Sequence, residues 1–95
     1  MKTHILKTWP EFFAALADGS KTFELRRNDR DFKPGDVLEL REFDPTGGDF
    51  TGRMIRRRVG YILTHDDCWE AFAFYGLCDG GDDWCIMSIH PVESP

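Results

Sequence analysis

The fold of this chain is decided by one stretch, Gly19-Ser20-Lys21-Thr22-Phe23-Glu24-Leu25-Arg26-Arg27-Asn28-Asp29-Arg30-Asp31-Phe32. The stretch begins with a glycine of the kind that ends helices and continues as an alternating strand. Phe23 and Leu25 share one face of that strand, while the opposite face carries Thr22, Glu24 and Arg26. Ionisable side chains at every second position either line a site or form an ordinary solvated strand face.

Two elements precede this stretch. Residues 4–7 predict a short first strand. Thr8 and Glu11 have the spacing of a capping box, so we expect a helix from about Pro10 to Asp18 with Thr8 as its N-cap. Its inner side is expected to carry Phe12, Phe13 and Leu16. Gly19 then fits the position just past a helix end, and the strand that follows is expected over residues 21–26.

Turns alternate with strands in the rest of the chain. The charged segment 28–31 predicts a turn that returns the chain to the core at Phe32, and residues 33–36 predict a second turn around Pro34 and Gly35. We expect strands at 37–43, 53–63 and 84–89, and a short helix at 66–72. The order favours a small, mostly antiparallel curved sheet or barrel with one helix beside it.

The strand patterns also predict which side chains face the core. In the strand 37–43, the leucines at 38 and 40 are expected inward and Glu39 and Arg41 outward. In the strand 53–63, one face is expected to carry Ile55, Val59, Tyr61 and Leu63, with Arg57 interrupting it. Gly60 predicts a bulge in this strand.

Length and composition set the general class of the protein. Its 95 residues predict a single domain over residues 1–95 with one modest core. No apolar run approaches the roughly 18 residues of a membrane span, and the N-terminus lacks the apolar region of a signal peptide. We therefore expect a cytoplasmic protein with no membrane association.

Charge is distributed unevenly along the chain. All 12 Lys and Arg residues lie at or before Arg58, together with 10 acidic residues, whereas seven acidic residues and no Lys or Arg follow. The net charge of −5 is compatible with a local anion site and does not suggest a wide surface for duplex nucleic acid. The acidic C-terminal part leaves a protein-interaction module open as an alternative, with a basic partner.

The cysteines argue against a metal or disulfide framework. They number three, at Cys68, Cys78 and Cys85, and no pair has C-x-x-C spacing. We expect reduced apolar cysteines and neither a metal nor another cofactor. A weaker alternative is a metal site built from His65, Asp67, Cys68 and Cys78.

The pattern G-x-K-T-x-E-x-R over Gly19 to Arg26, followed by Pro34-Gly35-Asp36 and an apolar strand, resembles the signature of the ASCH domain in the PUA-like superfamily. Within it, the charged turn Arg26 to Phe32 and the stretch Asp44-Pro45 to Gly52-Arg53 resemble a small uncharacterised bacterial and phage family. The resemblance covers roughly residues 4–63. It implies an α+β fold, a mostly antiparallel PUA-like β-barrel of about five to six strands with one or two short helices.

The resemblance also implies a cleft beside the helix that binds RNA or a nucleotide. Some ASCH proteins are amidohydrolases that remove the acetyl group of N4-acetylcytidine, using a lysine of the G-x-K segment, a threonine three residues later and a distant glutamate. Lys21 matches that lysine, whereas Glu24 stands at the threonine position and Thr22 lies beside the lysine. An amidohydrolase for an acylated nucleoside is therefore the alternative function, with Lys21, Thr22 and Glu24 as its catalytic residues and water as the nucleophile.

The candidate binding site is built on the same segment. A carboxylate can accept hydrogen bonds from a base edge, and arginine can bind phosphate or stack on a base. The residues predicted to bind RNA, a nucleotide or a nucleoside are Trp9, Lys21, Thr22, Glu24, Arg26, Arg27, Asn28 and Arg30. The ligand is expected to be small or single-stranded, and Arg30 is expected to face phosphate.

Two further groups of residues have both a functional and a structural interpretation. The run Arg56-Arg57-Arg58 can line a nucleic-acid groove, or it can be a solvated face paired with Glu39 and Glu42 of the neighbouring strand. Five aromatic residues can stack on bases or belong to the core: Trp9, Trp69, Phe74, Tyr75 and Trp84. The sequence leaves the oligomeric state open.

Overall fold

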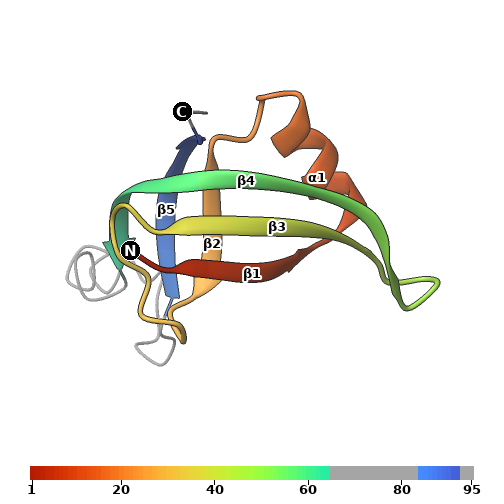
Figure 1. Cartoon of the computed structure of the whole chain (residues 1–95), viewed down its shortest axis with the longest axis horizontal. Helices are drawn as coiled ribbons and strands as arrows, with labels where there is room; N and C mark the ends of the chain where they lie inside the picture. Colours follow the sequence, from red (N-terminus) through yellow and green to blue (C-terminus); the bar gives the residue numbers. More distant parts are fainter. Residues whose placement is uncertain (65–83, 93–95) are drawn as a thin grey trace, which may run out of the picture.

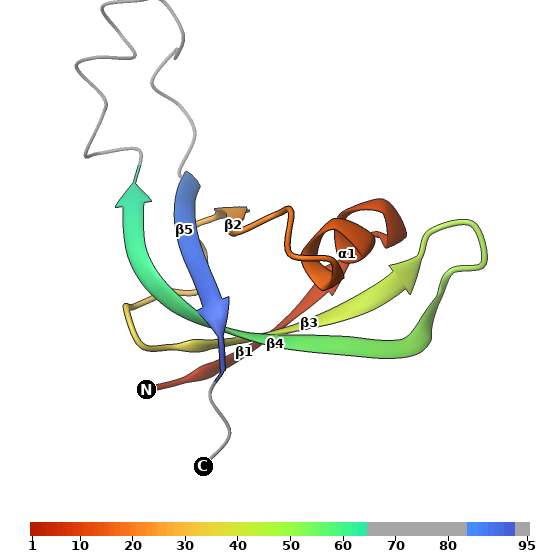
Figure 2. The same ribbon diagram turned by 90° about the horizontal axis from the view of Figure 1, so that it is seen from above.

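One strongly curved sheet carries the fold of this protein, whose computed structural model describes residues 1–64 and 84–92. The elements are β1 (Thr3–Thr8), α1 (Pro10–Ala17), β2 (Phe23–Arg27), β3 (Val37–Asp44), β4 (Asp49–Thr64) and β5 (Trp84–Pro91). The strands lie in the order β1-β3-β4-β5-β2, which places β1 and β2 at the two edges (Figure 1). The helix α1 connects these edges and lies on the concave side of the sheet (Figure 2).

The sheet is an open half-barrel with mixed strand directions. β1 pairs with β3 in parallel, and the other three pairs are antiparallel. The parallel pair arises because β1 continues into a helix instead of a hairpin, and parallel strands need such a long connection. The predicted small α+β fold, a curved sheet with one helix beside it, is confirmed, and the predicted barrel is a half-barrel because β1 and β2 form no ladder with each other.

The core fills the concave side of the sheet. Its members are Leu6, Leu16, Phe32, Leu38, Leu40, Val59, Cys85, Met87 and Ile89. The predicted inward orientation of Leu38 and Leu40 is confirmed, since both are fully buried. Phe32 returns to the core as expected after the charged turn, and Gly35 takes the positive φ of +92° that its turn requires.

The start of α1 differs from the prediction. Trp9 is the N-cap residue, no side chain caps the helix, and Thr8 is the last residue of β1 with a buried side chain. Phe13 and Leu16 are buried as expected, but Phe12 is half-exposed and does not belong to the core. The capping-box spacing was misleading because the hydroxyl of Thr8 accepts a hydrogen bond from Arg26 of β2 instead.

The bulge predicted at Gly60 is confirmed. Beyond it, the β4 residues expected to face the core face outward, and those expected to face outward face the core. The register shifts between Val59 and Ile62, so that Ile62 pairs with core residue Met87 and packs against the core. Tyr61 is thereby turned outward, where 70% of it is exposed, and Leu63 pairs with Ile86 on the outer face. The prediction that both share a face with Ile55 and Val59 was wrong, because an extra residue in a strand reverses the alternation beyond it.

Arginines of β3 and β4 neutralise two buried carboxylates. Glu39 faces outward, as predicted, but it is buried beneath Arg41 and Arg56, whose hydrogen bonds hold the pKa of its carboxyl below the usual value. Glu42 is paired with Arg53, and the hydrogen bonds from Arg53 and then Thr51 likewise lower its pKa. The predicted pairing of the arginine run therefore holds for Glu39, whereas Glu42 uses Arg53 in place of that run.

The inward-facing Arg57 also has a structural partner. Its Nη2 donates to the carbonyl oxygen of Leu16 at 3.2 Å, in the last turn of α1. A helix leaves its last carbonyl groups without partners inside the helix, and the guanidinium is a second donor to this one beside the backbone N–H of Gly19. Arg57 thus ties α1 to the concave face of the sheet.

Several predictions fall outside the described residues. These are the helix at 66–72 and most of the acidic C-terminal part. Within the part of the chain that the structure describes, no helix is both long enough and apolar enough to cross a membrane.

Candidate binding site at the sheet seam

Two arginines join the edges of the half-barrel. Arg26 of β2 donates from Nη2 to the carbonyl oxygen of Lys7 at 2.9 Å and to Thr8 Oγ1 at 3.4 Å. Arg30, in the turn after β2, donates from Nη1 to the carbonyl oxygen of Ile5 at 2.8 Å. We call this junction between β1 and β2 the seam. At the seam, hydrogen bonds from side chains join the two edges of the sheet, because β1 and β2 do not pair with each other.

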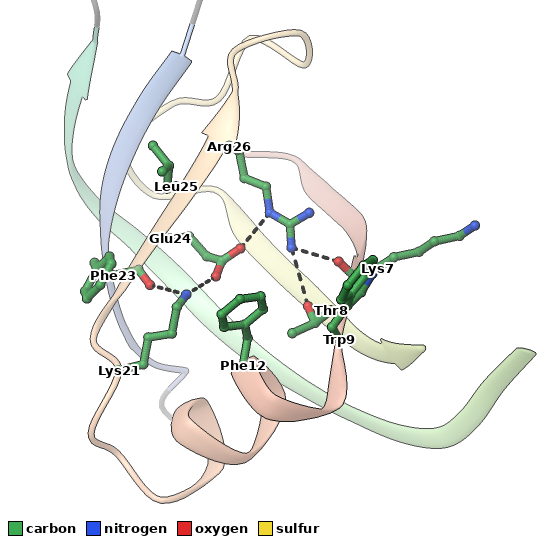
Figure 3. A pocket seen from close by; sticks show the side chains of 9 residues that line it. All are labelled: Lys7, Thr8, Trp9, Phe12, Lys21, Phe23, Glu24, Leu25 and Arg26. Atoms are coloured by element: carbon green, nitrogen blue, oxygen red, sulfur yellow. Dashed lines mark hydrogen bonds and ion pairs between the residues drawn. The ribbon is translucent and has the colours of Figure 1, made fainter. Parts of the chain in front are cut away.

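A pocket of about 560 Å³ lies at the seam, between the start of α1 and β2 (Figure 3). Its apolar lining comes from Trp9, Phe12, Phe23 and Leu25. Its polar lining comes from Thr8, Lys21, Glu24 and Arg26, and Lys7 completes the wall. We call it the seam pocket. Its volume falls in the range of roughly 300–1,000 Å³ that is typical of small-molecule sites.

Glu24 is the polar centre of the seam pocket. Only 3% of it is exposed, and the two cations approach its carboxylate from opposite sides (Figure 3). Arg26 Nε donates to Oε2 at 2.6 Å, and Lys21 Nζ donates to Oε1. Lys21 Nζ also donates to the carbonyl oxygen of Phe23 at 2.8 Å. The buried carboxylate is thus fixed in position by paired cations, as a buried charge must be.

The local chain path explains this convergence. Gly19 adopts φ +85° at the end of α1, as predicted, and the backbone N–H of Lys21 donates to the carbonyl oxygen of Ala15. This brings Lys21 to the entrance of β2. The strand period then places Glu24 and Arg26 on the concave face, opposite the core residues Met87 and Cys85 of β5.

The aromatic residues give the seam pocket a flat apolar wall. Trp9 and Phe12 lie three residues apart at the start of α1, and each is half-exposed. Phe23 is also half-exposed, and the ammonium of Lys21 lies over its ring, 5.0 Å from the ring centroid. An aromatic wall beside an anchored carboxylate suits a planar ligand that carries hydrogen-bond donors.

The seam pocket unites four of the residues predicted to bind a ligand: Trp9, Lys21, Glu24 and Arg26. Thr22 is exposed and does not line the pocket, and its carbonyl oxygen accepts from the backbone N–H of Ile89. Asn28 lines none of the pockets described here. Arg27 and Arg30 lie at a neighbouring cavity instead.

This neighbouring cavity has a volume of about 160 Å³ and is lined by three arginines, one acid and two core residues: Arg26, Arg27, Arg30, Asp29, Leu6 and Phe32. We call it the arginine cavity. It shares Arg26 with the seam pocket. The charged turn predicted to rim the cleft therefore supplies a separate small cavity on the same seam.

Sequence reasoning missed five residues of the seam pocket, of which Phe23 and Leu25 were placed only on the strand face opposite Glu24. Phe12 was assigned to the core and Thr8 to a helix cap, and Lys7 was given no role. The i, i+3 spacing of Trp9 and Phe12 was the available signal, because it places both on one side of the first helical turn. Lys7 contributes a carbonyl oxygen, which no side-chain pattern reveals.

Of the remaining candidates, those that the structure describes do not add to this site. Within residues 1–64 and 84–92, no group of three or more metal-ligating side chains gathers. The alternative metal ligands at 65, 67, 68 and 78 lie outside the described residues, as do Trp69, Phe74 and Tyr75. Trp84 begins β5 and is partly buried.

Comparison with known proteins assigns this chain to a family. The model of the family described as Domain of unknown function (DUF3850) matches residues 3–89. An uncharacterized 12.9 kDa protein of Escherichia phage P2 is 32% identical over 71 residues, which are 75% of this chain and 63% of that relative. The chain therefore spans less than two thirds of that relative's length.

Solved structures share the fold. The ASCH protein from Zymomonas mobilis has a TM-score of 0.61 at 16% identity, over 93% of this chain and 66% of that one. A hypothetical protein named PH0355 has a TM-score of 0.59 at 18% identity, over 97% of this chain and 100% of that one. The chain belongs to the DUF3850 family and has the fold of a small ASCH-like domain.

Proposed function

We propose that the seam pocket binds a nucleobase, so that the protein is a binding module for RNA or a nucleotide. The observation that carries this proposal is the buried carboxylate of Glu24, fixed by two cations, beside the half-exposed rings of Trp9 and Phe12. Proteins read unpaired bases by stacking them on aromatic side chains and by hydrogen bonding to their edges.

The carboxylate of Glu24 retains capacity for a ligand. An ionised carboxylate has about four lone-pair sites, and Lys21 and Arg26 each occupy one. The remaining sites can accept from the amino or imino groups of a base edge, as glutamate does from the amino group of cytosine. Because the cations already orient the carboxylate, little freedom is lost when a ligand binds.

The wall of Trp9 and Phe12 supplies the complementary apolar contact. Stacking of a base on an aromatic side chain is worth about 1–3 kcal/mol. Such stacking tolerates different bases, whereas a carboxylate selects bases whose edge carries an amino group. The combination favours cytosine, adenine or guanine over uracil, whose single imino N–H lies between two carbonyl oxygens that a carboxylate repels.

Direct titration tests the proposal. Calorimetry with the four ribonucleosides and with short single-stranded RNA should detect binding that Trp9→Ala weakens by about tenfold or more. Glu24→Gln should reduce the preference among bases. Tyr61→Ala removes a more exposed aromatic side chain from the outer face of β4 and serves as the matched control. Thermal unfolding of each variant establishes that it is folded.

Two outcomes would contradict the base site. One is the absence of binding to any of these ligands. The other is binding that Trp9→Ala and Tyr61→Ala weaken equally, since the seam pocket would then have no special role.

A second candidate is the hydrolysis of an acylated nucleoside such as N4-acetylcytidine. The contact of Lys21 with Glu24 favours it, because a carboxylate beside a cation can activate water while the cation stabilises a developing oxyanion. Thr22 lies outside the pocket and is a poor nucleophile for this reaction. Incubation with N4-acetylcytidine should release cytidine and acetate, and Lys21→Ala should abolish the release; turnover unchanged in that variant would exclude this site.

A further inference from the structure

We infer that the arginine cavity is a phosphate subsite that adjoins the seam pocket. The ligand is then a nucleotide unit, with its base in the seam pocket and its phosphate among Arg26, Arg27 and Arg30. This inference rests on the proposed function and narrows its ligand class from bases in general to phosphorylated nucleosides.

The sizes of the two cavities suit different parts of one ligand. The seam pocket, of about 560 Å³, accommodates a base, whereas the arginine cavity, of about 160 Å³, is smaller than a typical small-molecule site. Arg26 lines both cavities, so they meet at one side chain. A compact anion fits the smaller space.

Two of the three arginines of the arginine cavity have no carboxylate partner. Within the described part of the chain, the side chain of Arg27 makes no hydrogen bond or ion pair, and Arg30 is bonded to a carbonyl oxygen and to no carboxylate. Arg26 is paired with Glu24, so the charge open to a ligand is that of Arg27 and Arg30 against Asp29, the one acid among the lining residues, a formal +1. By contrast, Arg41, Arg53 and Arg56 on the sheet are each paired with a buried glutamate.

The shared residue Arg26 is held in place before any ligand arrives. Its Nε is bonded to Glu24 and its Nη2 to Lys7 and Thr8, while Nη1 has no partner among the described residues. Guanidinium groups bind phosphate through charge-assisted hydrogen bonds, and a fixed guanidinium loses little entropy in doing so. Arg26 can therefore contribute its free Nη1 to an anion.

The floor of the arginine cavity strengthens this attraction. Leu6 and Phe32 form it, with exposures of 4% and 5%. Apolar side chains at the base of a concave site reduce the local dielectric constant, so charges around the rim act on an anion more strongly than on a flat surface.

The experiment compares each ribonucleoside with its 5′- and 3′-monophosphates, and includes inorganic phosphate, by calorimetry on the full chain. At least one monophosphate should bind about tenfold or more tightly than its nucleoside. Arg27→Gln should reduce that advantage to about threefold or less while leaving nucleoside affinity unchanged. Arg56→Gln makes the same change in charge on β4, at a residue that does not line the arginine cavity, and should keep the full advantage.

Arg30→Gln provides a second variant. It should also reduce the advantage of the monophosphate, and unfolding measurements will separate this effect from the loss of its bond to Ile5. The advantage should decline with added salt, since phosphate binding is screened, whereas nucleoside binding should not.

The outcomes separate this inference from the proposed function. Monophosphates that bind no better than nucleosides, or an advantage unchanged in Arg27→Gln, would overturn the phosphate subsite and leave the base site standing. Binding of inorganic phosphate that Arg27→Gln abolishes, without any binding of nucleosides, would support the anion subsite and overturn the base site.

Discussion

Arg26 on β2 donates a 2.9 Å hydrogen bond from Nη2 to the carbonyl oxygen of Lys7 on β1, and so links two edge strands that form no ladder. An unpaired strand edge exposes carbonyl groups that attract other chains. Here the carbonyl oxygens of Lys7 and Ile5 are occupied by Arg26 and Arg30. The same guanidinium orients Glu24, so closure of the half-barrel and assembly of the seam pocket depend on one side chain.

Replacement of Arg26 by lysine should therefore destabilise the fold. Lysine keeps the charge but lacks the planar fork that reaches Glu24, Lys7 and Thr8 together. Because hydrogen bonds to charged groups contribute about 1.5–3 kcal/mol each and lysine retains part of the attraction, we expect a loss of about 1–3 kcal/mol in the free energy of unfolding by urea. Arg27→Lys is the matched control and should change it by less than about 0.5 kcal/mol. Equal losses in both variants would show that the bridge to Lys7 does not hold the seam.

Arg57→Met should loosen the C-terminal end of α1. Methionine keeps much of the volume of the side chain but cannot donate to the carbonyl oxygen of Leu16. We expect a loss of about 0.5–1.5 kcal/mol, the usual contribution of one hydrogen bond. Amide hydrogen exchange should accelerate in the last turn of α1 more than in β3. Uniform acceleration in both elements would argue against a local role for Arg57.

The buried contact between His4 and Asp36 predicts a dependence of stability on pH. Burial alone would raise the pKa of Asp36, but hydrogen bonds from His4 and from the backbone N–H groups of Lys2 and Lys33 outweigh it and keep the pKa of this carboxyl below its usual value. A depressed carboxyl pKa stabilises the folded state above the unfolded-state value, and this stabilisation is lost as the pH falls through the lower folded-state value.

The wild-type protein should thus be more stable than Asp36→Asn at pH 7, and the difference should shrink below about pH 4. Urea unfolding of both proteins at pH 7, 5, 4 and 3 measures this difference in the free energy of unfolding. His4→Gln, which removes one of the three partners, should show a smaller version of the same trend. A difference between wild type and Asp36→Asn that stays constant over this range would contradict the proposed role of the ionised Asp36.

Gly35→Ala should destabilise the turn before β3. Gly35 has φ +92°, and no atom lies within 4 Å of the position that a Cβ would take, so the expected cost is conformational and not steric. A left-handed conformation costs an alanine roughly 1–2 kcal/mol. The matched control is Gly47→Ala in the turn between β3 and β4, where φ is not positive and the loss should be smaller. Thermal unfolding of the two variants compares them, and a larger loss in Gly47→Ala would refute the argument.

Local pattern was sufficient to locate most elements. The helix end at Gly19, the turn at Gly35 and the bulge at Gly60 could be predicted because glycine conformations and turn chemistry depend on near neighbours. Glu24 and Arg26 could be placed together for a similar reason, since a strand puts alternate residues on one face, and the helix end at Gly19 brings Lys21 to the entrance of that strand. The bulge also limited the prediction, because its effect on Tyr61 and Leu63 depends on how β4 pairs with β5.

The sequence by itself thus determined a small curved sheet with one helix and a charged segment from Lys21 to Arg26. Only the tertiary structure decided that this charged face turns inward, that β1 lies parallel to β3, and that Thr8 accepts from Arg26 instead of capping α1. The physical reason is the range of the interactions. Alternation and turn preferences act between near neighbours, whereas the seam joins residues 18, 19 and 25 positions apart through hydrogen bonds that exist only when the half-barrel has curled.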